Sequence, residues 1–135
     1  MTMKKDVLNM TFEERVKHPK SLLCLDFDGV IHHYRQGYKD GSIYDQPVPG
    51  VKEAIQKYLE VFDIVIFSAR ANTQKGRKEM REWLKKHDLP LLPLTSEKPP
   101  AFLTIDDRAV TFDGTFPDTE TLEEFVPWNQ VGWKK

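Results

Sequence analysis

The sequence predicts an α/β domain in which helices alternate with the strands of a mainly parallel sheet. Three apolar runs of strand length occur at residues 22–25, 64–67 and 102–105. Helical patterns fill residues 51–59 and 74–87 between them. Such alternation is typical of β-α-β units, whose right-handed crossovers make successive strands point the same way. Because the first run is unbroken, we expect both of its faces to be covered.

The composition fits one ordinary globular domain spanning residues 1–135, with a helical appendage over 1–20 and a tail over 126–135. The net charge of −1 gives no general attraction to nucleic acid or membrane. No apolar stretch is long enough to cross a bilayer, and the first residues lack the apolar core of a signal peptide. The single cysteine, Cys24, excludes an internal disulfide and lies inside an apolar run, where we expect a small buried hydrophobe rather than a catalytic thiol. We therefore expect a cytoplasmic protein.

The first half of the chain supplies a short helix, a strand, a loop and a second helix. A capping box opens a helix at Thr11, and Pro19 ends it. The loop over residues 32–48 is rich in tyrosine, glycine and charge and has no helical period, so we expect an irregular loop or a small hairpin. Apolar residues at helical spacing then predict an amphipathic helix from Val51, Ala54, Ile55, Tyr58 and Leu59.

The second half continues the alternation with shorter elements. A helix over residues 74–87 places Met80, Trp83 and Leu84 on one face. We expect a short strand within residues 89–94, interrupted by two prolines, and a late strand or hairpin over 109–116 around an Asp-Gly turn. A final short helix, capped by Asp118 or Thr119, precedes the tail.

Polar residues follow all three apolar runs. Because parallel strands end at one edge of their sheet, and ligands bind just beyond that edge, these side chains are expected to form a site. The residues are Asp26, Asp28, Ser68, Asp106 and Asp107, together with Lys98 just before the third run.

The residue types at this edge suit a phosphate ester. Asp26 and Asp28 start on one side of their strand, and Gly29 lets the chain turn sharply. Carboxylates this close repel unless one is protonated or a cation lies between them, and oxygen ligands favour Mg²⁺. A metal and Lys98 would offset phosphate charge, Ser68 would donate a hydrogen bond, and a carboxylate would attack phosphorus. Taken alone, the first segment is equally well explained as a strand end followed by a polar turn.

The ordered set resembles the four motifs of the haloacid dehalogenase (HAD) superfamily of phosphohydrolases. The matching stretches are Asp26-Phe27-Asp28-Gly29-Val30, Ser68 after a strand, Lys98, and Asp106-Asp107 after a strand, within about Ser21 to Phe125. The resemblance implies a Rossmann-like three-layer sandwich with a mainly parallel central sheet. Neither segment between the motifs has room for an inserted cap domain, so the chain is similar to the capless members.

The resemblance also implies a phosphatase that works through an aspartyl-phosphate intermediate. Asp26 would be the nucleophile and a Mg²⁺ ligand. Asp28 would be the general acid and base and would bind Mg²⁺ through its backbone carbonyl. An aspartate at this position favours phosphatases and phosphotransferases over dehalogenases.

The remaining motif residues would bind the substrate and the metal. By the resemblance, Ser68 and Lys98 would hold the transferring phosphoryl group. Asp106 would complete the metal site, and Asp107 would be a ligand directly or through water.

Other residues near the motifs have less certain roles on sequence grounds alone. Arg70 is either a salt-bridge partner or a substrate contact. Tyr34 belongs to the 32–48 loop, which we expect to contact substrate through its tyrosines. His32 and His33 follow the nucleophile loop, and we favour plain surface histidines because nothing gives them metal-ligand spacing.

Three functions fit these observations, two of them enzymatic and one not. The first is a Mg²⁺-dependent phosphatase acting on a small phosphorylated molecule. The second is a polynucleotide 3′-phosphatase, suggested by the open site and by the basic helix within residues 75–86, which would show salt-sensitive binding to nucleic acid ends. The third is a non-catalytic binding or regulatory module on the same fold, which would have no use for an aspartate at position 28.

Overall fold

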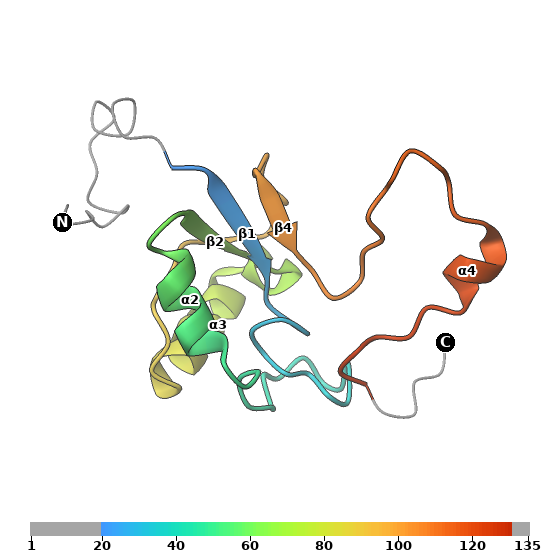
Figure 1. Ribbon diagram of the computed structural model, residues 1–135. Helices are drawn as coiled ribbons and strands as arrows, with labels where there is room; N and C mark the ends of the chain where they lie inside the picture. The colour runs from blue at the N-terminus through green and yellow to red at the C-terminus, as the bar shows by residue number, and fades with distance from the viewer. Residues whose placement is uncertain (1–19, 131–135) are drawn as a thin grey trace.

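The computed structural model describes residues 20–130 and has an α/β fold built on a four-stranded parallel sheet (Figure 1). The strand order is β3-β2-β1-β4, which confirms the predicted parallel sheet. The strands are β1 (Leu22–Asp26), β2 (Asp63–Phe67), β3 (Leu94–Thr95) and β4 (Leu103–Ile105). The helices are α2 (Val51–Tyr58), the 3₁₀ helix η2 (Ala69–Asn72), α3 (Gln74–Lys86) and α4 (Thr119–Glu123). The helix expected to begin at Thr11 and the end of the tail, 131–135, lie outside the described residues.

The hydrophobic core lies between the sheet and helices α2 and α3. In the β1–β2 ladder, Leu23 pairs with Ile64 and Leu25 with Ile66, so these four side chains share one face. The apolar stripes of both helices pack on them, which confirms the amphipathic pattern of the sequence. The helical residues buried in this core are Val51, Ile55, Met80, Trp83 and Leu84.

The opposite face of the sheet is less completely covered. Cys24 is fully buried at the centre of this face, and burial raises the pKa of its thiol, which fits the expected inert hydrophobe. Its neighbours Val65 and Thr104 are half-buried. The expectation that both faces of β1 are covered is therefore confirmed for Leu23, Cys24 and Leu25, which are all buried.

The segment after β4 differs from its prediction. Residues 109–116 form no strand, although the predicted turn exists, with the backbone N–H of Thr115 donating to Asp113 Oδ1 at 2.9 Å. Figure 1 shows this segment running away from the sheet toward α4, where it has no neighbouring strand to complete a ladder. The predicted cap of α4 is confirmed, since Asp118 accepts a hydrogen bond from the N–H of Thr121. The strand expected within 89–94 is shorter and later than predicted, because its two prolines prevent regular pairing before Leu94.

The 32–48 loop is irregular, as predicted, and its ends pair across its base. The N–H of His33 donates to Gln46 O, and that of Val48 to Ile31 O, both at 2.9 Å. Within residues 20–130, no helix has the length and apolar character needed to cross a membrane.

Candidate active site

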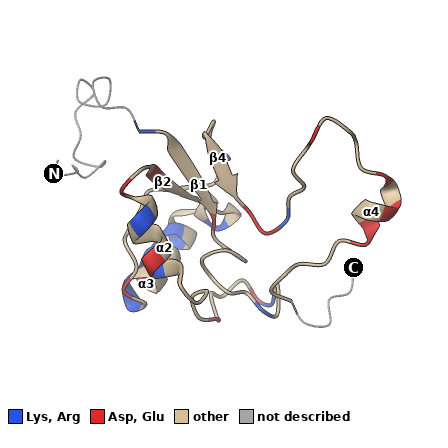
Figure 2. Ribbon diagram, viewed as in Figure 1, with Lys and Arg blue, Asp and Glu red and all other residues tan. Residues whose placement is uncertain are grey.

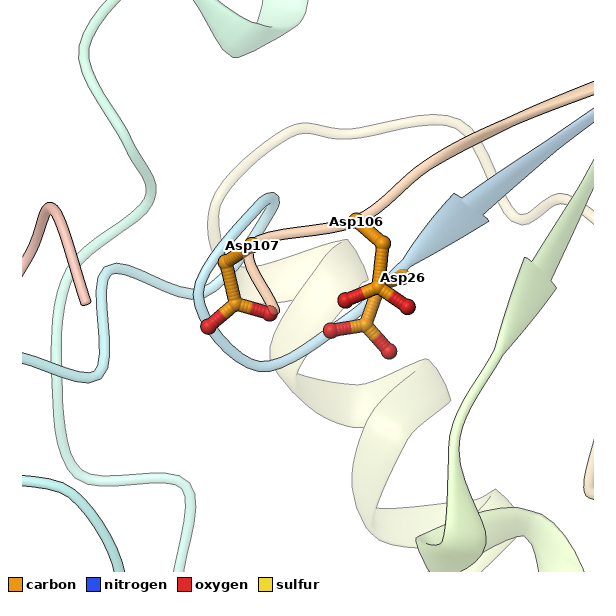
Figure 3. Close-up of side chains that lie close together, drawn as sticks. All are labelled: Asp26, Asp106 and Asp107. Atoms are coloured by element: carbon orange, nitrogen blue, oxygen red, sulfur yellow. The ribbon is translucent and has the colours of Figure 1, made fainter. Parts of the chain in front are cut away.

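The carboxyl ends of β1 and β4 bring three carboxylates together (Figure 3). Asp26 is the last residue of β1, and Asp106 and Asp107 directly follow β4. One oxygen atom from each carboxylate lies within 4.8 Å of the others. Figure 2 shows this acidic segment after β4, whereas lysines and arginines are concentrated on α2 and α3. Three such oxygen donors could hold a hard divalent cation.

Gly29 makes this close approach possible. Its φ angle is +91°, a conformation that side chains rarely adopt. A Cβ atom at this position would also lie 2.1 Å from Asp107 Oδ2, which is far inside van der Waals contact. Gly29 therefore lets the chain turn after β1 and leaves room for the carboxylate of Asp107, which follows β4.

Burial and mutual repulsion change the pKa values of the three carboxylates in different directions. Burial, hydrogen bonding with Asp107 and repulsion from Asp106 raise the pKa of Asp26 to about 8. Burial likewise raises the pKa of Asp107. For Asp106 burial acts in the same direction, but the backbone N–H of Arg108 and the ammonium of Lys98 outweigh it and hold its pKa below the ordinary value. The cluster thus retains protons unless a cation replaces them.

Asp28 has quite different surroundings. Arg70 Nε donates to both of its carboxylate oxygens, at 3.2 and 2.9 Å. His32 Nδ1 lies 2.8 Å from Oδ1. Burial alone would raise the pKa of Asp28, but these hydrogen bonds exceed that effect and hold its pKa below the ordinary value. The protein therefore keeps this carboxylate ionised with its own groups.

The prediction for His32 was wrong. The side chain is completely buried rather than at the surface, and it contacts Asp28 directly. His33 is half-buried and stacks on Trp128, with ring centroids 5.3 Å apart. The two histidines have no metal-ligand spacing, and the signal in the sequence that bears on His32 is its four-residue interval from Asp28 across a tight turn.

Arg70 is a salt-bridge partner, which was one of its two predicted roles. Besides Asp28, it donates through Nη1 to the carbonyl oxygen of Gly41, so it links the 32–48 loop to the site. Gly76 of α3 packs against the Arg70 backbone so closely that a Cβ would lie 1.8 Å from the Arg70 carbonyl oxygen. The start of α3 thereby fixes the position of this arginine.

The structure places the two predicted phosphate-binding residues at neighbouring strand ends. Ser68 follows β2 and is almost completely buried, and its Oγ accepts a hydrogen bond from the N–H of Arg70 at 3.1 Å. Lys98 is half-exposed, and its Nζ lies 3.2 Å from Asp106 Oδ2. Neither residue lines the cavity beside the carboxylates. Their contact with a phosphoryl group stays a prediction.

An open cavity of about 550 Å³ lies beside the carboxylates, and both predicted catalytic residues reach it. Tyr34, the predicted substrate contact, lines it as well. The lining residues are Asp26, Asp28, Tyr34, Gly37, Tyr38, Asp106, Asp107, Arg108 and Gln130. A cavity of this size could accept a small phosphorylated molecule.

The tail contributes contacts that sequence reasoning did not find. Trp128 Nε1 donates to the carbonyl oxygen of Gly29 at 2.8 Å. Asn129 Nδ2 donates to the carbonyl oxygens of His33 and Tyr34 at 2.7 and 3.2 Å. Figure 1 shows the chain returning from α4 toward the 32–48 loop. Through these hydrogen bonds, residues 126–130 secure the turn that follows β1.

Comparison with known proteins adds no relative. No protein-family model matches the sequence, and neither the curated proteins nor the solved structures give a match. Membership of the HAD superfamily stays a prediction from the motifs.

Proposed function

We propose that this protein is a Mg²⁺-dependent phosphomonoester hydrolase of the HAD type, with a Rossmann-like fold and no cap domain. The observation that carries the proposal is the meeting of Asp26, Asp106 and Asp107 at the carboxyl edge of a parallel sheet. Close carboxylates need protons or a cation, and an all-oxygen donor set fits Mg²⁺. Lys98 beside Asp106 and the adjacent cavity supply a further positive charge and space for a substrate.

The reaction has two steps, which the two catalytic aspartates share. Ionised Asp26 attacks phosphorus and breaks its bond to the leaving oxygen, which gives an aspartyl phosphate. Asp28, which its partners keep ionised at rest, first takes up the proton of a monoanionic ester and passes it to the departing alkoxide. Water then attacks the aspartyl phosphate while Asp28 removes its proton, which releases phosphate and restores Asp26. When bound, Mg²⁺ offsets the negative charge of the phosphoryl group.

The proposed substrate is a small phosphate ester. The basic helix that suggested a nucleic acid end also carries glutamates at helical spacing from its lysines, with Lys75–Glu79 at 3.9 Å and Lys78–Glu82 at 3.8 Å. This helix therefore offers no uniform basic face. Arg70 and Tyr34 stay the proposed substrate contacts, Tyr34 because it lines the cavity and Arg70 because it joins Asp28 to the loop.

Turnover of a chromogenic aryl phosphate tests the proposal. We expect the purified protein to hydrolyse it with Mg²⁺, to lose activity in EDTA, and to lose it completely as Asp26→Asn, because an amide is a poor nucleophile. Asp113→Asn, the same change at an exposed position after β4, is the matched control. Near-normal turnover by Asp26→Asn would exclude the mechanism. No turnover by wild-type protein across a panel of phosphorylated metabolites and oligonucleotides would favour a non-catalytic module.

A further inference from the structure

His32 is held in one orientation at the centre of an aromatic cage. Its side chain is 0% exposed. Four rings surround the imidazole with centroid distances between 5.4 and 5.7 Å, and they come from the turn, the loop and α3. These rings belong to Phe27, Tyr34, Tyr44 and Trp83. Close packing on all sides leaves the ring no room to rotate.

The hydrogen bonds of the ring identify its tautomer. The backbone N–H of Asp45 points to His32 Nε2 at 3.0 Å. A backbone N–H can only donate, so Nε2 accepts and carries no proton. The proton of the neutral ring is therefore on Nδ1, from which it is donated to Asp28 Oδ1 across 2.8 Å.

The amide that selects this tautomer is itself fixed. Arg35 Nε and Nη2 donate to the two carboxylate oxygens of Asp45, at 3.1 and 2.7 Å. Trp83 Nε1 donates to the Asp45 carbonyl oxygen at 3.1 Å. Asp45 is thus held through its side chain and its backbone, and its N–H has one direction in which to point.

We propose that His32 is a positioning residue, which fixes the Asp28 carboxylate by donating from Nδ1 while the Asp45 amide holds Nε2. This inference depends on the proposed phosphatase function, in which Asp28 moves the proton. Arg70 Nε donates to both oxygens of Asp28, and His32 Nδ1 adds a hydrogen bond to Oδ1, so two side chains together fix the carboxylate. Residues that orient the groups of a site in this way are typically worth about 10–100-fold in activity.

Two amide substitutions separate the two nitrogen atoms of the ring. In His32→Asn, the amide nitrogen occupies roughly the place of Nδ1 and can still donate to Asp28. In His32→Gln, the longer side chain carries its amide to the place of Nε2 and leaves Asp28 without this donor. We expect His32→Asn to keep kcat within about threefold and His32→Gln to lower it by about 10–100-fold, with KM little changed in both. His33→Gln is the matched control, since its side chain has no contact with Asp28.

The tautomer can be measured without any activity. In wild-type protein labelled with ¹⁵N, we expect Nδ1 of His32 to carry the proton and Nε2 to have the shift of an unprotonated nitrogen. A proton on Nε2 would overturn the inference, and so would equal kcat values for folded His32→Asn and His32→Gln in an active enzyme. If His32→Gln does not fold, the tautomer measured in wild-type protein tests by itself whether Nδ1 donates to Asp28. An inactive wild type would instead overturn the proposed function, and with it the role of His32 in turnover, while the tautomer measurement stands separately.

Discussion

Asp26 and Asp28 are two residues apart, yet the protein surrounds them in opposite ways. Asp28 is paired with Arg70 and His32, and these partners hold its pKa below the ordinary value. Asp26 lies beside two more carboxylates, and its pKa rises to about 8. One half of the site is thus neutralised by the protein, and the other half is left for protons or a cation.

The turn after Phe27 causes this difference. The N–H groups of Ile31 and His32 both donate to the Phe27 carbonyl oxygen at 2.9 Å, which folds the chain back within one turn. Asp26 therefore stays at the end of β1 beside β4, whereas Asp28 meets the 32–48 loop and Arg70. A single tight turn assigns neighbouring carboxylates to separate electrostatic environments.

Replacing Asp28 by asparagine tests the half of the site that the protein neutralises. Asparagine cannot move a proton, although its backbone carbonyl is unchanged. We expect Asp28→Asn to lower kcat by about 10²–10⁴-fold, the usual contribution of general acid–base catalysis. The loss should be larger for an alkyl phosphate than for an aryl phosphate, because an aryl leaving group needs less protonation. Steady-state kinetics at saturating Mg²⁺ measure both values. A loss that disappears when Mg²⁺ is raised would contradict the acid–base assignment.

The sequence predicts the acidic half of the site better than the half around Asp28. The meeting of Asp26, Asp106 and Asp107 follows from strand order, because parallel strands end at the same edge. The four-residue interval between Asp28 and His32 is a local signal, whereas the contacts of His32 with Trp83 and with the Asp45 amide are long-range and no local pattern encodes them. The strands were likewise predicted correctly where a neighbouring strand supplies the hydrogen bonds of a ladder. The prediction was wrong at 109–116, where the alternating residues have no partner strand.

The acidic half should make the metal-free protein less stable as pH rises. Between about pH 4 and 8, folded Asp26 keeps a proton that the unfolded chain has released, so the folded state binds more protons and stability falls with increasing pH. The slope is at most about 1.4 kcal/mol per pH unit for each such proton. Asp28 has the opposite sign: its contribution is present above the unfolded pKa and is lost as pH falls below it. Urea unfolding in EDTA across this pH range measures the slope.

Mg²⁺ should remove that slope, because it stabilises the ionised cluster. At a concentration 100 times its Kd, the ion would stabilise the folded state by about 2.7 kcal/mol. Asp106→Ala should lose most of this gain, and Asp26→Asn should flatten the metal-free slope. A wild-type melting temperature that does not respond to millimolar Mg²⁺ would count strongly against a metal site.

Both halves of the site open to the same cavity, which the 32–48 loop borders. Tyr38 lines it and is 74% exposed, so its ring can meet a substrate without supporting the fold. Tyr44 stabilises the loop, because its hydroxyl donates to Gly37 O at 2.8 Å and accepts from the N–H of Gln36 at 2.9 Å. Tyr34 has both roles, because it lines the cavity, where it can meet a substrate, and it packs on His32, where it supports the fold.

Substitutions of Tyr38 and Tyr44 therefore test substrate choice separately from stability, with the smallest expected effects. We expect Tyr38→Ala to change the order of kcat/KM among phosphate esters while altering unfolding free energy by less than about 0.5 kcal/mol, as an exposed substitution should. Tyr44→Phe, the matched contrast, should lower stability by about 1 kcal/mol through its lost hydrogen bonds and leave the substrate order unchanged. Competition assays on a metabolite panel, with urea unfolding of each variant, compare the two. If Tyr38→Ala leaves kcat/KM unchanged for every ester, this tyrosine has no part in substrate choice, and selectivity must come from other groups that line the cavity, such as Arg108 and Gln130.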